Sequence, residues 1–218
     1  MKRGGSGRSA AALARLTPES RHEGTRRTVD DTRAADLERK RRRLAEERDV
    51  EVPKVKNARR RARCRGDAMA FVRTYFKATM YLAMSDMHKG IIARGQQLIK
   101  YGGRKSLAAP RGHGKSTVIA MLAIWAILYG HVKFFLIVCG NTEEAENRLE
   151  EIKHQLETNE MLMEDFPEVC ALVRALDRSP LRARKLTVNG KFVDMEWYGD
   201  HIILPSYDGE PNSGGILA

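Results

Sequence analysis

The feature that most constrains the fold is a glycine-containing segment placed directly before the longest apolar run of the chain. Residues 107–117 read L-A-A-P-R-G-H-G-K-S-T, and the apolar run 118–129 follows without a break. A loop of small residues that ends in Gly-Lys-Ser and opens an apolar helix is typical of a phosphate-binding loop. The run has twelve residues, whereas a membrane span needs about 20. It therefore predicts a buried helix over residues 115–129.

The residue types of this loop suit nucleotide chemistry. Gly112 and Gly114 let the backbone turn so that successive N–H groups point inward and, with the start of the helix, surround a β-phosphate. Lys115 adds a positive charge for the β- and γ-phosphates, and the hydroxyl of Ser116 can ligate Mg²⁺. Ala109 stands where the usual pattern has its first glycine. ATP and Mg²⁺ are thus the predicted cofactors, although a glycine-rich turn with a solvated lysine is the alternative.

The predicted nucleotide contacts extend over the loop and the first helical turn. They are Pro110, Arg111, Gly112, His113, Gly114, Lys115, Ser116 and Thr117. Arg111 precedes Lys115 by four positions, and an arginine there can stabilise the charge that develops in phosphoryl transfer. We therefore predict Arg111 and Lys115 as the catalytic residues, the alternative for Arg111 being an ion pair that anchors the loop. His113 at the loop apex is more typical of a filler or substrate-facing residue.

The segments around the loop alternate between strand and helix patterns. Residues 105–109 are a short strand candidate, and Lys133–Cys139 is a continuous apolar run typical of a strand buried on both faces of a parallel sheet. A helix capped by Asn141 or Thr142 follows. The order strand, loop, helix, strand, helix predicts an α/β fold.

Further elements are predicted on both sides of this unit. Helices are expected over residues 68–76 and 85–97, and strands over Lys185–Val188 and His201–Leu204. In the helix after residue 142, apolar residues recur on one face; they are Ala145, Leu149, Ile152 and Leu156. Glu144 and Arg148 have the spacing of a favourable i,i+4 pair.

The charge of the chain is concentrated in its first third. Residues 1–65 hold 21 Lys and Arg against 10 Asp and Glu, whereas residues 66–218 hold 18 of each sign. This predicts a basic arm over residues 1–65 and a neutral body over residues 66–218. The arm is expected to be flexible or helical, with the helix over residues 33–48. The runs Arg39–Arg43 and Arg59–Arg65 suit a phosphate backbone without sequence readout. A solvated arm or one that docks a protein is the alternative.

Several segments together resemble the large terminase subunit of tailed bacteriophages, in the N-terminal ATPase portion of that DNA-packaging motor. They are Phe71–Phe76, Ser85–His88, the A-A-P-R-G-H-G-K-S-T loop and Cys139–Glu146. The resemblance covers about residues 68–170 well and 171–218 loosely. It implies a P-loop NTPase three-layer sandwich with a mostly parallel sheet, in which ATP hydrolysis drives double-stranded DNA into proheads.

The resemblance also implies partners and residue roles. The partners would be double-stranded DNA, the small terminase subunit and the portal protein, in a ring in the cytoplasm of a bacterial host, with no membrane. Lys115 and Ser116 would be the phosphate and Mg²⁺ residues, and Arg111 would sense the γ-phosphate. His88 would lie near the adenine, or else be a helix surface residue. Asn141 and Thr142 would face the nucleotide or the DNA.

One departure from this family is plain. A hydrolytic P-loop ATPase needs a strand that ends in an acidic pair, and the nearest candidate, Ile202–Glu210, is interrupted by Pro205. The resemblance therefore implies a chain truncated before the acidic strand and the nuclease domain. Other interpretations stay open: a helicase-like ATPase, a non-catalytic nucleotide- or DNA-binding module, or a small P-loop kinase with Arg174–Arg184 as its lid.

Overall fold

The computed structural model describes residues 48–80, 83–108, 110, 112–207 and 214–218. The chain divides into two units, Met1–Glu47 and Arg48–Ala218, and all described residues belong to the second. The run Arg39–Arg43 and nearly all of the predicted helix over 33–48 lie outside the described residues. Residues 48–65, which we assigned to the basic arm, are part of the second unit.

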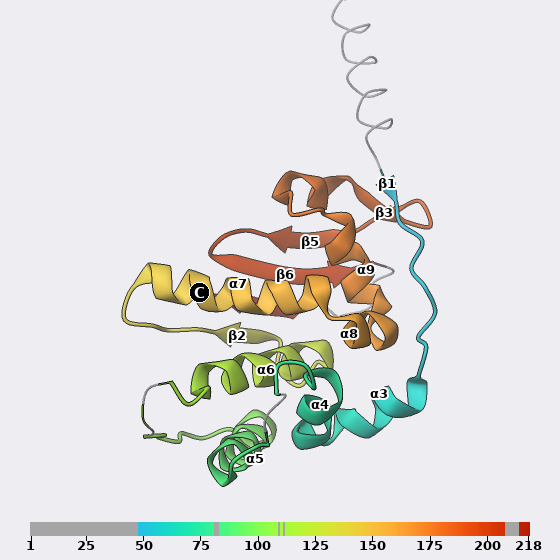
Figure 1. Cartoon of the computed structure of the whole chain (residues 1–218). Helices are drawn as coiled ribbons and strands as arrows, with labels where there is room; N and C mark the ends of the chain where they lie inside the picture. Colours follow the sequence, from blue (N-terminus) through green and yellow to red (C-terminus); the bar gives the residue numbers. More distant parts are fainter. Residues whose placement is uncertain (1–47, 81–82, 109, 111, 208–213) are drawn as a thin grey trace, which may run out of the picture. The chain divides into compact units, whose positions relative to one another are not determined.

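The larger of the two sheets in the described residues has four strands in the order β2-β7-β6-β5. These strands are β2 (Phe134–Leu136), β7 (Gly215–Leu217), β6 (His201–Ser206) and β5 (Asp194–Trp197). The β2 and β7 strands are parallel, whereas β6 is antiparallel to both of its neighbours (Figure 1). The α/β character is thus confirmed, but this sheet is mixed and not mostly parallel. The short connection from β5 to β6 is one that only antiparallel strands allow.

A second, small sheet joins the start of the described unit to its middle. It has the order β1-β3-β4 and consists of β1 (Arg48–Asp49), β3 (Leu186–Val188) and β4 (Lys191–Phe192). The β1 and β3 strands are parallel, and Asp49 Oδ1 accepts hydrogen bonds from the Thr187 hydroxyl and the Gly190 N–H. The sheet ties residue 48 and its neighbours to residues nearly 140 positions later in the chain.

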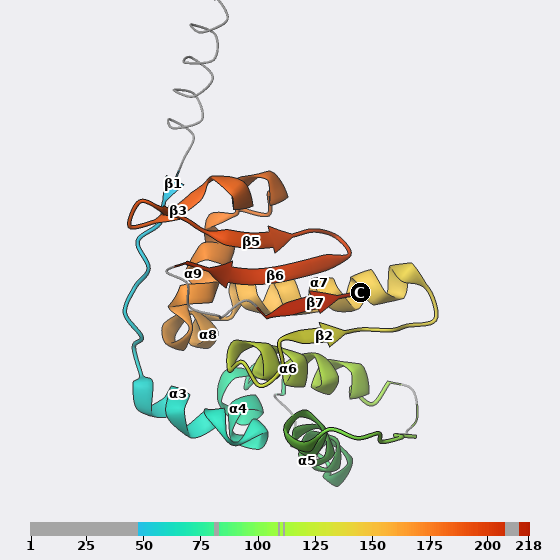
Figure 2. The same cartoon turned by 180° about the vertical axis from the view of Figure 1, so that it is seen from behind.

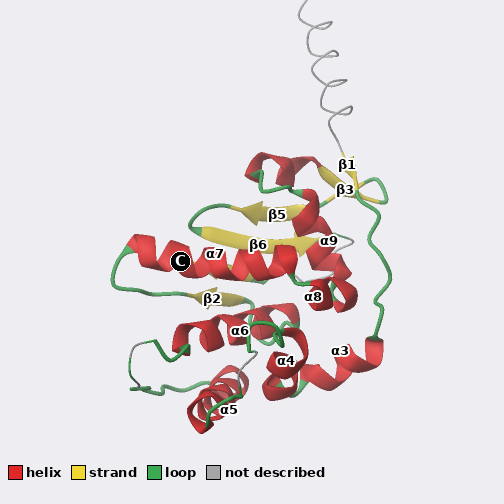
Figure 3. Ribbon diagram, in the orientation of Figure 1, coloured by secondary structure: helices red, strands yellow, loops and turns green. Residues whose placement is uncertain are grey.

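Seven α-helices are described in addition to one 3₁₀-helix, η1 (Pro180–Lys185). They are α3 (Ala58–Arg65), α4 (Ala68–Tyr75), α5 (Asp86–Tyr101), α6 (Lys115–Leu128), α7 (Thr142–Thr158), α8 (Glu160–Asp165) and α9 (Pro167–Ala175) (Figure 3). The predicted helices near 68–76, 85–97, 115–129 and after 141 are therefore confirmed. None of the described helices has the length and apolar character that a membrane span requires.

Helix α7 lies over one face of the four-stranded sheet, and the view from behind shows no described helix over the opposite face (Figure 2). Burial follows this arrangement. Met195, Trp197, Ile202, Leu204 and Ile216 are buried, whereas the residues that alternate with them up to Leu204 are exposed (Asp194) or partly exposed (Glu196, His201 and Ile203). The described part of this sheet therefore forms two layers with its helices.

The strand predicted as buried on both faces is an edge strand instead. Phe134, Leu136 and Val138 are 58%, 56% and 81% exposed, while Phe135 and Ile137 between them are partly buried. The apolar run alternates in exposure because no described helix covers its second face. The strand predicted over residues 105–109 is also not formed in the described residues 105–108.

Pro205 does not interrupt its strand as the sequence suggested, because β6 extends through it to Ser206. The pairing of β6 with β7 covers only residues 201–203, and its pairing with β5 has an irregularity opposite the end of β6. A proline is tolerated at such a position, where the ladder does not need its N–H.

Helix α3 is held to α8 by a buried acid. Asp165 has no exposed surface, and its carboxylate accepts from Arg60 Nε at 2.5 Å, Arg60 Nη2 at 2.8 Å and the Tyr75 hydroxyl at 2.6 Å. Arg61 donates to the Asp165 carbonyl and pairs with Glu168. Two arginines of the predicted phosphate-binding run 59–65 thus bind acidic residues within the fold.

The β5–β6 turn carries a histidine between two carboxylates. His201 lies 2.8 Å from Asp200 through Nδ1 and 2.8 Å from Glu196 through Nε2, and its ring contacts Tyr198. Burial disfavours the charged ring, but the hydrogen bonds to Asp200 and Glu196 outweigh it, so the pKa of His201 is raised.

This histidine predicts a pH dependence of stability. A raised folded-state pKa means that its contribution is complete below the unfolded pKa of about 6.5 and is lost as the pH rises through the folded value. We expect the melting temperature of the wild type to exceed that of His201→Gln by more at about pH 5.5 than at about pH 8.5. Equal differences at the two pH values, measured by thermal unfolding, would contradict the role of these ion pairs.

Candidate functional site

The backbone of the predicted loop has the conformation that its glycines allow. Gly112 and Gly114 have φ values of +80° and +66°, in the left-handed region. Residues with a Cβ adopt this region at a cost, whereas glycine adopts it freely. A Cβ at Gly112 would meet nothing within 4 Å, so the backbone, and not crowding, makes glycine the suitable residue there.

Helix α6 begins directly after this turn, and its N-terminus has no side-chain cap. It starts at Lys115, has 14 residues and carries no acidic residue in its first turn. The first N–H groups of a helix have no partner within the helix, and the helix dipole adds partial positive charge there. The turn and the helix start together form an arrangement suited to phosphate.

Lys115 and Ser116 follow on the first turn of α6, as the sequence predicted. Lys115 Nζ donates to the carbonyl of Pro110 at 2.5 Å, so its side chain folds back to the start of the loop. Ser116 is exposed and Thr117 is partly buried. Arg111, the predicted in-loop arginine, lies outside the described residues.

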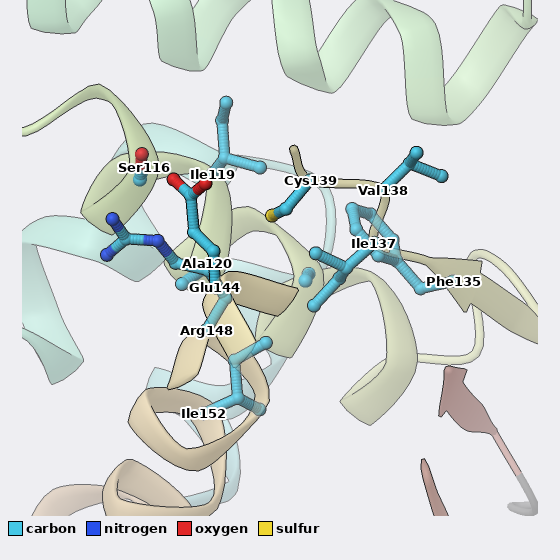
Figure 4. Close-up of a pocket in the computed structure, with 11 residues that line it drawn as sticks. Ser116, Ile119, Ala120, Phe135, Ile137, Val138, Cys139, Glu144, Arg148 and Ile152 are labelled. Atoms are coloured by element: carbon cyan, nitrogen blue, oxygen red, sulfur yellow. The ribbon is translucent and has the colours of Figure 1, made fainter. Parts of the chain in front are cut away.

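A hollow of about 170 Å³ opens beside Ser116, between α6, the residues after β2 and the start of α7. Its apolar walls include Ile119, Ala123, Phe135, Ile137, Val138 and Ile152. The polar groups on it are Ser116, Glu144 and Arg148, which Figure 4 shows on the same side of the hollow. A hydroxyl, a carboxylate and a guanidinium thus share one space next to the loop.

Two of these polar side chains have the oxygen atoms that a metal ion could bind. Hydroxyl and carboxylate oxygens are the protein ligands that Mg²⁺ prefers, and Mg²⁺ is bound by few of them because it keeps several waters. Ser116 and Glu144 are the oxygen donors that line this hollow. Within the described part of the chain, no group of three or more His, Cys, Asp or Glu residues is arranged to hold a metal ion.

The sequence did not single out Glu144 and Arg148 as site residues. It predicted an ion pair between them, whereas Arg148 Nη1 pairs with Glu151 Oε1 at 2.7 Å. A Cβ at Gly140 would lie 3.7 Å from Glu144 Oε2, which places this carboxylate near the turn after β2. Their position after a predicted strand could have singled them out, because residues just after the carboxyl end of a strand tend to reach ligand sites in α/β folds.

His88 lies against the loop. It is in the first turn of α5, and its Nε2 is 2.9 Å from the carbonyl oxygen of His113. Asn141 caps α7 by accepting a hydrogen bond from the Glu144 N–H at 2.7 Å, which confirms its predicted capping role, and Thr142 is the first residue of α7. The acidic residues of the candidate segment, Asp208 and Glu210, lie outside the described residues.

No family model, curated protein or solved structure matches the chain.

Proposed function

We propose that the chain binds ATP with Mg²⁺ at residues 110–117 and is the ATPase portion of a terminase-type motor that packages double-stranded DNA. The observation that supports this most is the turn formed by Gly112 and Gly114, both left-handed, directly before an uncapped apolar helix. The finer features of the proposal, a P-loop NTPase fold with its partners DNA, small terminase subunit and portal protein, rest on the resemblance of the sequence segments.

In this proposal each residue of the loop has a separate task. The N–H groups of the turn and of the first helical turn hold the β-phosphate. Lys115 exchanges the Pro110 carbonyl for the β- and γ-phosphate oxygens, and Arg111 stabilises charge on the γ-phosphate. Ser116 and Glu144 provide oxygen atoms on the side where Mg²⁺ would bind, the ion that neutralises phosphate charge during transfer.

A second candidate function is nucleotide binding without turnover. The strand beside the loop, β2, leads into Val138, Cys139 and Gly140, none of which is acidic. Hydrolysis by a P-loop enzyme needs a carboxylate that orients the metal shell or the attacking water. This observation favours a binding module in which ATP occupies the loop but is not cleaved.

Replacing Lys115 by alanine tests the proposal. We expect the affinity for ATP in the presence of Mg²⁺ to fall roughly 10- to 100-fold, since contacts to charged groups contribute about 1.5–3 kcal/mol. Isothermal titration calorimetry measures this directly. Lys100→Ala is the matched control, because Lys100 donates to the distant Gly66 carbonyl. Unchanged binding by Lys115→Ala would show that the loop is not a nucleotide site.

Phosphate release distinguishes the candidates. Turnover by the wild type that Lys115→Ala abolishes supports the ATPase, whereas binding without phosphate release supports the binding module. Stimulation of turnover by double-stranded more than by single-stranded DNA supports a packaging-type motor over a helicase-like ATPase.

A further inference from the structure

We infer that His88 is a positioning residue, which sets the orientation of the phosphate loop and does not contact the nucleotide base. The inference rests on the proposed function in one respect only, that the loop binds phosphate. It differs from the sequence-based expectation, which placed His88 near the adenine.

Both ring nitrogens of His88 are engaged within the protein. Nδ1 is 3.3 Å from the backbone nitrogen of Ser85 and 3.1 Å from its hydroxyl, while Nε2 is 2.9 Å from the His113 carbonyl oxygen. The Ser85 hydroxyl in turn accepts from the His88 backbone N–H, which completes a capping box at the start of α5. The ring is thus fixed at one end by its own helix and at the other by the loop.

These partners determine where the proton of the ring lies. A backbone N–H can only donate, so Nδ1 accepts the Ser85 N–H with its lone pair. A backbone carbonyl can only accept, so Nε2 carries the proton and donates it to the His113 carbonyl. The neutral ring therefore satisfies both contacts at once. Neither nitrogen is left to bond a base.

The contact to His113 orients the peptide group between His113 and Gly114. The described peptide bonds are all trans, and in a trans peptide the C=O and N–H bonds point in opposite directions. When His88 holds the His113 carbonyl toward itself, it directs the Gly114 N–H away from itself. A peptide next to a left-handed glycine can rotate at little cost, so this hydrogen bond restricts a group that would otherwise turn.

The His88 ring also lies next to Gly114. A Cβ on Gly114 would lie 3.6 Å from His88 Nε2, in ordinary van der Waals contact. Gly114 is also the residue that precedes the first turn of α6, where the phosphate-binding N–H groups begin. His88 therefore connects α5 to the point at which the loop becomes a helix.

The test compares ligands that share phosphates but differ in the base. ADP, GDP and inorganic pyrophosphate are titrated into wild type, His88→Ala, His88→Gln and Ser85→Ala. We expect His88→Ala to weaken all three ligands by a similar factor, roughly 10-fold, because it acts on the phosphate end. His88→Gln should recover much of this affinity, since a glutamine amide can donate to the His113 carbonyl.

Ser85→Ala is the control for a purely structural role of the helix cap. It removes the side-chain cap of α5 and the Ser85 hydroxyl from Nδ1, but it keeps the Ser85 backbone N–H on Nδ1 and the His88–His113 contact. We therefore expect a lower melting temperature with pyrophosphate affinity within about twofold of the wild type. A loss of ADP affinity without loss of pyrophosphate affinity in His88→Ala would place the ring at the base and overturn the inference. Unchanged binding of all three ligands would overturn it as well. If the wild type bound none of them, the proposed function would itself be wrong, and this inference with it.

Discussion

Replacing Asp165 by alanine is expected to lower the free energy of unfolding by about 3–5 kcal/mol, the usual result of removing one partner of a buried ion pair. Asp165 has no exposed surface, and its carboxylate accepts from both Arg60 and Tyr75. Without it, the guanidinium of Arg60, whose side chain is only 18% exposed, loses its main counter-charge. The Tyr75 hydroxyl also loses its acceptor in the core.

Asp165 contributes to the raised pKa of both of its partners. The hydrogen bond from Arg60 to Asp165 is the main reason that the pKa of Arg60 is raised. Burial, followed by the hydrogen bond to Asp165, raises the pKa of Tyr75. Both groups are therefore held in their protonated forms around one carboxylate.

Urea unfolding of a matched pair of variants measures this effect. Glu164→Ala is the control, because Glu164 also pairs with Arg60 and with Lys56 but is partly exposed. Surface ion pairs contribute little, so the loss in Glu164→Ala should be much smaller than in Asp165→Ala. Equal losses would show that burial of Asp165 does not determine its contribution.

The helices could be predicted from the sequence because their apolar spacing is local. Leu149, Ile152 and Leu156 recur on one face and are all buried in α7. The positions of the strands within the sheet were harder to predict. The run that contains Phe134 and Leu136 reads alike whether its strand lies in the middle of a sheet or at its edge, and only the neighbouring elements decide between the two.

The residues of the candidate site also divide into those that a local pattern predicts and those whose contacts depend on distant parts of the chain. The two left-handed glycines and Lys115 follow from a local motif whose geometry depends on adjacent residues. The contact of His88 with His113 joins positions 25 apart, and Arg60 meets Asp165 across 105 positions. A run of arginines looks the same whether it faces solvent or acids within the fold, so its role depends on partners that local spacing does not reveal.

The second large effect is expected at Trp125, in the second half of α6, the helix that begins directly after Gly114. Trp125 is fully buried, its Nε1 donates to the Cys64 carbonyl at 2.9 Å, and its ring lies 4.4 Å from that of His131. Trp125→Ala should lower the free energy of unfolding by about 3–5 kcal/mol, since it removes a large apolar side chain and leaves a cavity.

Trp125→Phe separates packing from hydrogen bonding at this position. It keeps an aromatic ring but removes the indole N–H from the Cys64 carbonyl, which still accepts from the backbone N–H groups of Gly66 and Asp67, so we expect a loss of about 0.5–1.5 kcal/mol. Urea unfolding with and without pyrophosphate measures both variants. Because α6 carries Lys115 and Ser116 on its first turn, a ligand at that turn should stabilise each variant that keeps the helix start intact. If Trp125→Phe lost as much stability as Trp125→Ala, the hydrogen bond to Cys64, and not the packing of the ring, would be what holds α6 against α3.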